Sequence, residues 1–384
     1  MKTNEEKIKE ILEKGTVEVI EREHLNLALK SGKKLKIKFG IDPTAPDLHL
    51  GHAVPLRKLR QFQNAGHQAI LIIGNYTAQI GDPSGRDITR KPLTKEEIKK
   101  NIKKYLGQAG KIIDIKKTKI LHNSKWLDNA RLPIVLSAKA SVQQILERED
   151  FQKRINNRQS ITVLELLYPL FQGYDSVAVK ADVEIGGSDQ KFNLITGRKI
   201  QRAFNMPEQD ILTTPLLVGT DGVKKMSKSY GNYISISEKP EIMFSKIMKV
   251  PDSEVRNYFM LLTDEIPAGK FEKRMEEKKY LARQIVKMFY GEKKADKAKE
   301  YFEKTFSKKE NPTDIDIRVI GAGKEWGDFL VEEKFVTSKS EAKRLVGGGG
   351  IDFENTRISN SGEKIIKSGV AKIGKYKYIR IEVK

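Results

Sequence analysis

Two histidines three positions apart, His49 and His52, are the first residues of this sequence whose type and spacing suggest chemistry. They lie in the stretch IKFGIDPTAPDLHLGH, residues 37–52. A zinc-binding helix would need histidines four positions apart with a glutamate between them, and no third ligand is evident. No serine that could act as a nucleophile lies beside either histidine. Two explanations remain open: the pair only marks the start of a helix, or it binds a phosphate.

The surrounding residues favour the phosphate. A turn from a strand into a helix presents free backbone N–H groups and the positive end of the helix dipole at the edge of a parallel sheet. Gly51 would let a ligand approach the backbone closely, and His49 and His52 would add side-chain donors. Such a site stabilises charge that develops on a nucleotide phosphate without a covalent step. The pattern is neither a Walker loop nor a Gly-x-Gly-x-x-Gly fingerprint.

A second basic element, KKMSKS, occupies residues 224–229 after an Asp-Gly turn. Two lysines in a loop of small residues can move over a polyphosphate as a lid. A solvated run of charge is the alternative, and the loop alone does not decide between them.

The overall charge points to a polyanionic partner. The chain has 384 residues, with 72 Lys plus Arg against 51 Asp plus Glu, for a net charge of +21. Such an excess is typical of proteins that bind nucleic acid, although a highly charged surface alone would also explain it. The absence of cysteine excludes disulfides, thiolate zinc sites and cysteine nucleophiles. The charged amphipathic N-terminus is not a signal sequence and no apolar run approaches a membrane span, so we expect a cytoplasmic protein without membrane contact.

The elements that must position these residues have an α/β pattern. A strand at residues 34–41, a helix at about 51–65 and a buried strand at 68–75 form a βαβ unit. Thr94 and Glu97 form a capping box before a basic helix. We expect mainly helix at about residues 123–159 and 238–310, a linker at 310–317, and strands within 181–187 and 210–217. In the tail, two helices lead through a glycine turn at 347–350 to a final strand within 371–384.

The pairing of HLGH with KMSKS resembles the two signature sequences of class I aminoacyl-tRNA synthetases, with Leu50 in place of the usual isoleucine. The stretches IGDPSGR, residues 80–86, and LYPLFQGYDSVAVKADVEIGGSDQ, residues 167–190, resemble bacterial tyrosyl-tRNA synthetases, and the resemblance covers essentially the whole chain. It implies a Rossmann-like parallel-sheet catalytic domain at residues 1–230, with a helical insertion at about 120–160. It further implies an α-helical tRNA-contacting domain at 231–318 and a small α+β S-four-like RNA-binding domain at 319–384.

The resemblance also implies roles for individual residues. Asp175 would contact the substrate hydroxyl, and its spacing from Tyr168 and Gln172 places all three on one helical face. Pro169 must either start or kink that helix. The resemblance implies that the substrate ammonium is bound by Asp82, Tyr168 and Gln172, and that Gln190 lies beside the substrate carboxylate. It implies that the nucleotide is lined by Asp42, Gly51, Gly187 and Asp189. The leaving phosphates would be contacted by Thr44 and His49, the adenylate by His52, and pyrophosphate by Lys225, Lys228, Arg86 and Arg90.

One position departs from the best-known bacterial enzymes of this family. They carry a tyrosine two positions before the glycine of GxDPT, and this chain has Lys38. A second bacterial branch departs in the same way, and the wording of the motifs here is similar to that branch. We expect the phenol to rely on Asp175, with Lys38 turned away or paired to an acid.

The activity implied is that of a tyrosine–tRNA ligase. ATP with Mg²⁺ would activate L-tyrosine to tyrosyl-adenylate, and the tyrosyl group would pass to the terminal ribose of tRNA(Tyr). The family also implies a homodimer and no structural metal. The alternatives are a tryptophanyl enzyme, which shares the fold, and a non-catalytic RNA-binding relative. A small nucleotidyltransferase with a similar histidine turn would not need this length, the lysine loop or the tail.

Overall fold

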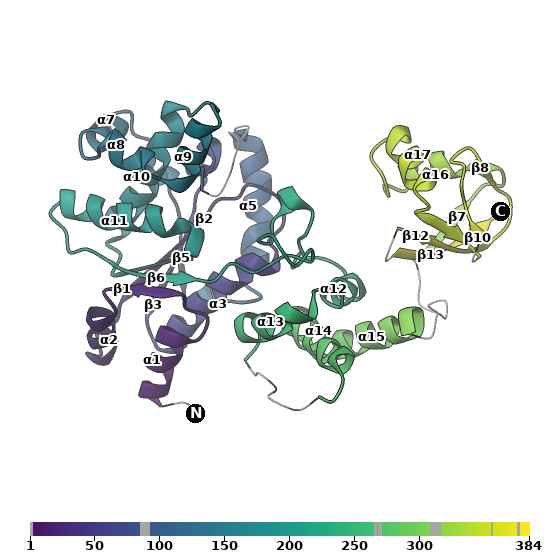
Figure 1. Cartoon of the computed structure of the whole chain (residues 1–384), viewed down its shortest axis with the longest axis horizontal. Helices are drawn as coiled ribbons and strands as arrows, with labels where there is room; N and C mark the ends of the chain where they lie inside the picture. Colours follow the sequence, from purple (N-terminus) through teal and green to yellow (C-terminus); the bar gives the residue numbers. More distant parts are fainter. Residues whose placement is uncertain are drawn as a thin grey trace.

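A six-stranded sheet lies between helices in the larger, N-terminal part of the molecule (Figure 1). The computed structural model describes residues 3–84, 93–264, 267, 271–307, 316–354, 356–374 and 377–384. The sheet has the order β1-β6-β5-β2-β3-β4. Its strands are β1 (Glu18–Ile20), β2 (Lys36–Ile41), β3 (Gln68–Ile73), β4 (Thr118–His122), β5 (Val183–Gly187) and β6 (Asp210–Thr214). All neighbours are parallel except β1, which runs antiparallel to β6. The predicted α/β class with a parallel-sheet core is confirmed.

The predicted βαβ unit is present as β2, α3 (Leu50–Asn64) and β3. Residues 69–73 of β3 are all buried, as the continuous apolar run indicated for a strand covered on both faces. Helix α3 buries Ala53, Leu56, Leu59 and Phe62 completely, at the helical spacing of three that its sequence shows. This helix fixes the position of the histidine turn relative to the sheet.

Helices cover both faces of the sheet. In Figure 1, α1 (Asn4–Glu13) and α3 lie on one side and α10 (Val163–Val179) and α11 (Lys191–Ala203) on the other. The other helices of this part are α2 (Arg22–Lys30), α4 (Thr77–Ile80) and α5 (Lys95–Ala109). The predicted capping box of Thr94 and Glu97 is confirmed at the start of α5. Pro169 lies inside α10, so the alternative that it starts this helix is wrong.

The segment between β4 and α10 is helical, as predicted, but it begins later than residue 120. Residues 120–122 belong to the edge strand β4, which the sequence pattern did not indicate. Short helices follow: α6 (Ser124–Leu127), α7 (Leu132–Ser137), α8 (Val142–Leu146) and α9 (Glu149–Asn156). Their apolar side chains form a hydrophobic cluster with α10.

After the lysine loop come the helices α12 (Pro240–Ile247), α13 (Val255–Leu262), α14 (Arg274–Tyr290) and α15 (Glu292–Phe302). They share one continuous hydrophobic cluster with the sheet and α3. Most of the predicted linker, residues 310–315, lies outside the described residues. Its last two positions, 316 and 317, belong instead to a strand.

The tail has its own hydrophobic cluster and sheet. Its elements are β7 (Asp316–Ile320), β8 (Lys324–Glu325), α16 (Trp326–Glu332), α17 (Lys339–Gly347), β9 (Ile351–Phe353), β10 (Thr356–Arg357), β11 (Lys364–Ile365), β12 (Gly369–Ile373) and β13 (Lys377–Val383). The glycine run forms a turn, with Gly349 at φ 70°. The prediction of a single final strand is wrong, because β12 and β13 are two antiparallel strands.

No helix among the described residues is long and apolar enough to cross a membrane.

A candidate active site at the carboxyl edge of the sheet

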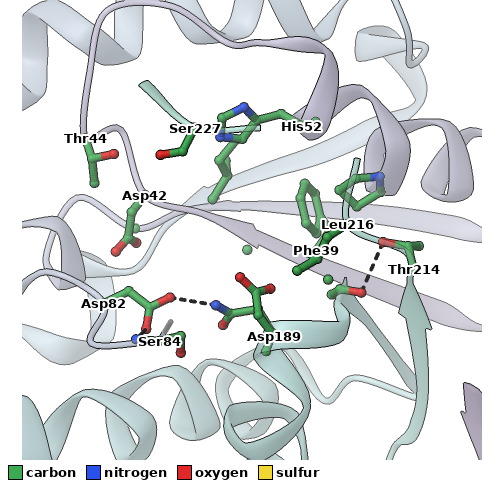
Figure 2. Close-up of a pocket in the computed structure, with 18 of the residues that line it drawn as sticks. Phe39, Asp42, Thr44, His52, Asp82, Ser84, Asp189, Thr214, Leu216 and Ser227 are labelled. Carbon is green, nitrogen blue, oxygen red and sulfur yellow. Dashed lines mark hydrogen bonds between the residues drawn. The ribbon is translucent and has the colours of Figure 1, made fainter. Parts of the chain in front are cut away.

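A cavity of about 720 Å³ opens where β2, β3, β5 and β6 end (Figure 2). The carboxyl edge of a parallel sheet is where α/β proteins bind ligands. The predicted site residues that the structure describes all line it: Asp42, Thr44, His49, Gly51, His52, Asp82, Tyr168, Gln172, Asp175, Gly187, Asp189, Gln190, Lys225 and Lys228. The predicted Arg86 and Arg90 lie outside the described residues.

The two histidines cap the start of α3 and fix each other's orientation. His49 Nδ1 accepts from the Gly51 backbone N–H at 3.2 Å, and His52 Nδ1 accepts from the His49 N–H at 3.2 Å. A neutral imidazole whose Nδ1 accepts must carry its proton on Nε2. Burial lowers the pKa of His52 to about 4, helped by the Lys228 ammonium, and burial also lowers the pKa of His49 well below its usual range. Both rings are therefore neutral Nε2–H donors at neutral pH.

The lysine loop folds back over this turn. Lys225 pairs with Asp189 at 2.7 Å, and the Lys228 ammonium donates to the backbone carbonyl of Asp47. Asn232 holds the loop, because its side chain accepts from the Ser227 N–H at 2.8 Å and donates to Asp221 at 2.9 Å. The Lys228 ammonium acts on both histidines, and Lys225 lines the same cavity in its ion pair with Asp189, so the loop adds positive charge at this end.

The opposite end of the cavity is acidic. Asp42 accepts from the Tyr168 hydroxyl at 2.9 Å and from Thr77 at 2.7 Å, and Asp82 accepts from Gln190 at 2.6 Å. Burial raises the pKa of Asp42 to about 7, although the Thr77 hydrogen bond opposes this shift. Asp42, for which the resemblance implied a nucleotide contact, is hydrogen-bonded here to Tyr168 and Thr77.

Asp175 is a further buried carboxyl group at this end. Its oxygens accept from the Trp126 indole N–H at 2.8 Å and from the Asn123 amide at 3.4 Å. Burial raises its pKa to about 7, against the lowering effect of the Lys38 charge. An acceptor held in this way and shielded from water suits a hydroxyl group on an otherwise apolar ligand.

Several contributing residues were not found by sequence reasoning. Asn193 donates to Gln172 at 3.1 Å and to Gln190 at 3.0 Å. Arg148, which precedes α9, donates to Asn193 at 3.0 Å and to Ser84 at 2.9 Å. No motif marks these residues, because most of their partners are distant in sequence and only the fold brings them together.

No group of three or more His, Cys, Asp or Glu in the described part of the chain is arranged to hold a metal ion.

Comparisons with known proteins agree with this geometry. The family described as "tRNA synthetases class I (W and Y)" matches residues 30–307. The tyrosine–tRNA ligase of Aquifex aeolicus is 49% identical over 389 residues, covering 99% of each chain. That of Thermotoga maritima is 47% identical, covering 99% of this chain and 98% of its own.

Solved structures share the fold. A C-terminally truncated mitochondrial tyrosyl-tRNA synthetase from Aspergillus nidulans superposes with a TM-score of 0.65 at 20% identity, over 78% of this chain and 94% of that one. The Archaeoglobus fulgidus tyrosyl-tRNA synthetase complexed with L-tyrosine superposes with a TM-score of 0.62 at 20% identity, over 77% of this chain and 100% of that one.

Proposed function

Because the chain belongs to the bacterial class I tyrosyl-tRNA synthetases and is a tyrosine–tRNA ligase, we propose that its cavity binds tyrosine at the acidic end and ATP at the basic end. The observation that carries this assignment is the polarity of one cavity, with buried carboxyl groups at one end and, at the other, Lys228 beside two neutral histidines and Lys225 paired with Asp189. A cationic ammonium fits the first end and a polyphosphate fits the second.

The first step is the attack of the tyrosine carboxylate on the α-phosphorus of ATP, with pyrophosphate as the leaving group. The attacking group is already an anion, so the step needs no general base. It needs alignment and stabilisation of the charge that moves to the leaving phosphates. His49 and His52 supply neutral N–H donors and Lys225 and Lys228 supply positive charge. Thr44, Gly51, Gly187 and Asp189 line the nucleotide region.

Tyrosine is held at both of its ends. Asp82, Tyr168 and Gln172 surround its ammonium group, and Gln190 lies beside its carboxylate. Asp175 accepts a hydrogen bond from the phenol. Phenylalanine would leave this buried acceptor without a partner, which accounts for the rejection of phenylalanine by roughly 10⁴–10⁵ that is already known for tyrosyl-tRNA synthetases as a class.

In the second step, a terminal ribose hydroxyl of tRNA(Tyr) attacks the adenylate carbonyl and releases AMP. The positive charge of the chain, +21, supports binding of the tRNA backbone across more than one part of the molecule. From Gly321 to Lys384 there are 13 basic and 9 acidic residues, so most of the excess lies outside the tail. We assign the tail, from residue 319, to RNA binding of the S-four type.

Mg²⁺ enters with ATP as its substrate complex, since this ion is usually held through phosphates with few protein ligands. We propose a cytoplasmic homodimer with the helical insertion at its interface. Exposed apolar side chains in this region, such as Ile134 at 73% and Val142 at 57%, support that location.

Exchange of ATP with labelled pyrophosphate tests the assignment directly. Tyrosine should support exchange, whereas tryptophan and phenylalanine should not. His52→Ala and Lys228→Ala should each lower the activation rate by ~10²–10³ with little change in tyrosine affinity, because both contacts strengthen in the transition state.

The exposed Lys224, on the same loop, provides a matched control, and Lys224→Ala should keep the wild-type rate. A His52 or Lys228 variant that loses tyrosine affinity and keeps its rate would show that the ends of the cavity are assigned the wrong way round.

A further inference from the structure

A lysine in the middle of the sheet is part of the wall behind the cavity. Lys38 on β2 lies in register with Glu184 on the neighbouring parallel strand β5, so both side chains point to the same face of the sheet. Their charged groups are 2.8 Å apart, and the side chains are 0% and 1% exposed. Glu184 lines the cavity. A buried pair of this kind does not by itself argue for stability, because desolvation offsets much of the attraction.

Each donor of the Lys38 ammonium has a partner within the protein. Besides Glu184, the group donates to the backbone carbonyl of Gln172 at 2.9 Å and to the Ser176 hydroxyl at 2.8 Å. An ammonium has three hydrogens, so all are used. Both of the additional partners lie on α10, the helix that also carries Tyr168 and Asp175. Lys38 therefore ties that helix to the sheet and has no hydrogen left for a phenol oxygen.

Glu184 and Asn193 together fix how the Gln172 amide is turned. Gln172 Nε2 faces Glu184 Oε1 at 3.4 Å, and Gln172 Oε1 accepts from Asn193 at 3.1 Å. An ionised carboxylate can only accept, so the amide must present its NH₂ group to Glu184. Gln172 lines the cavity, and an amide oxygen has two lone pairs, so the lone pair that Asn193 does not use can accept from the substrate ammonium at the place proposed for it. Ser176 at 3.1 Å and Gln209 complete the partners of Glu184.

The pair also sets the charge around Asp175. The groups that face this carboxyl are Lys38 from β2, Glu184 from β5, and Trp126 and Asn123 from the α6 segment, with Asp42 acting on it from the end of β2. The Lys38 charge lowers the pKa of Asp175 and the Glu184 charge raises it. Intact, the pair is close to neutral, whereas either member alone would leave a full charge beside Asp175.

We propose that Lys38 and Glu184 act together as positioning residues for tyrosine recognition. They fix α10 against the sheet, turn the Gln172 oxygen toward the substrate ammonium, and keep the surroundings of Asp175 electrically balanced so that it accepts the phenol. Neither residue touches the phenol. This inference rests on the proposed placement of tyrosine at the acidic end of the cavity.

Three variants test the pair: Lys38→Met, Glu184→Gln and the double variant Lys38→Met/Glu184→Gln. The measurement is KM and kcat for tyrosine and for phenylalanine in pyrophosphate exchange, between about pH 6 and pH 9. Lys38→Met should raise KM for tyrosine at neutral pH by ~10-fold or more, with kcat within about threefold, and should move the pH midpoint of kcat/KM upward by about one unit. Glu184→Gln should move the midpoint the other way.

The double variant separates the effect of the pair's charges on Asp175 from the effect of the Lys38 hydrogen bonds to α10. It should return the pH midpoint to the wild-type value, while KM for tyrosine stays raised and the preference over phenylalanine stays reduced, because Met cannot donate to α10. If Lys38→Met does not fold, the double variant still decides, since a purely structural pair would leave its tyrosine KM, selectivity and pH profile unchanged. Wild-type values in the folded variants would overturn the proposal.

Lys58 provides a matched control for the loss of a buried lysine. It is 2% exposed and donates to the carbonyls of Ile11 and Lys14, away from the cavity. Lys58→Met should lower stability and leave the tyrosine KM and its pH profile unchanged. Asp175→Asn, measured in parallel, distinguishes a failure of the proposed function of the cavity from a failure of the proposed role of the pair. If it retains selectivity for tyrosine, the proposed function of the cavity fails, whereas selectivity lost in Asp175→Asn and kept in Lys38→Met refutes only the role of the pair.

Discussion

The Asp175 carboxyl group, which we propose accepts a hydrogen bond from the tyrosine phenol, destabilises the folded state when it is ionised. Burial raises the pKa of this carboxyl to about 7 from 3.8, and the Glu184 charge adds to the rise. Between these two values the folded chain holds a proton that the unfolded chain has released. By linkage, its contribution to the free energy of unfolding falls as pH rises from about 4 to about 7.

Asp175→Asn should therefore gain stability relative to wild type as the pH is raised. The relative gain between about pH 5 and pH 8 should be about 2–3 kcal/mol, since each unit of pKa difference corresponds to ~1.4 kcal/mol. Urea unfolding of both proteins at the two pH values measures it. If the free energies of unfolding of the two proteins differ by the same amount at both pH values, this carboxyl has the same pKa in the folded and the unfolded chain, contrary to the expectation.

At the residue scale, the sequence identified the side chains that belong to motifs and missed those that support them. His49, His52, Lys225 and Lys228 were found because their types and spacing are local signals. The expected pairing of Lys38 with an acid is confirmed, although the sequence could not indicate Glu184, which lies 146 positions away by number. Support residues such as Asn193 and Arg148 come from different elements, so no local spacing reveals them.

At the element scale, the turn from β3 into α4 determines where Asp42 can lie. Gly74 occupies this turn, and a Cβ on it would overlap the carboxylate of Asp42 and the hydroxyl of Thr77. The backbone N–H of Gly74 also donates to the Ile41 carbonyl at 2.9 Å, which joins the ends of the two strands. A side chain here must displace Asp42 from Tyr168 and from the cavity.

Gly74→Ala should lower kcat/KM for tyrosine activation by ~10²-fold in a folded protein, because small displacements of binding groups are costly. Pyrophosphate exchange measures the rate, and circular dichroism confirms the fold. Gly107→Ala is the matched control, because a Cβ there meets nothing within 4 Å on α5. Activity of Gly74→Ala equal to that of the control would mean that the position of Asp42 is not needed.

Elements with a strong apolar pattern were predicted within one or two residues, as in α3 and β3. The shortest elements were not predicted from the sequence. Strand β1 has three residues, all half-buried, and gives no alternating pattern. The final hairpin was predicted as one strand, since β12 and β13 share the same alternation of basic and apolar residues. Pairing between strands, not propensity, decides such cases.

At the scale of the whole molecule, the hydrophobic cores divide the chain unevenly. One cluster joins the sheet to α12–α15, and a separate cluster holds the tail from Ile320 to Ile381. The proposed boundary near residue 231 therefore crosses a shared core, whereas the one near residue 319 falls close to a break between cores. Strand β7, which begins at Asp316, belongs to the sheet of the tail.

A chain that ends at residue 315 should retain pyrophosphate exchange within about threefold and lose tRNA(Tyr) charging by ~10²-fold or more in kcat/KM, because phosphate contacts of the tail add binding energy. In the full-length protein, KM for tRNA should rise steeply as salt increases from about 50 to 200 mM. Exchange at the same salt concentrations is the control. Charging by the shortened chain at the full-length rate would remove the tail from tRNA recognition.

The order of the strands has a consequence for synthesis on the ribosome. Strand β1 pairs with β6, and Thr213 donates to the Glu18 carbonyl across 195 positions of sequence. The first strand of the chain therefore has no partner in the sheet until more than half of the protein has been made, and apolar surface near the N-terminus stays exposed until then. Such distant pairing is slow and leaves apolar surface open to association. The cavity is also completed late, because Lys228, which lines it, follows β6 in the sequence.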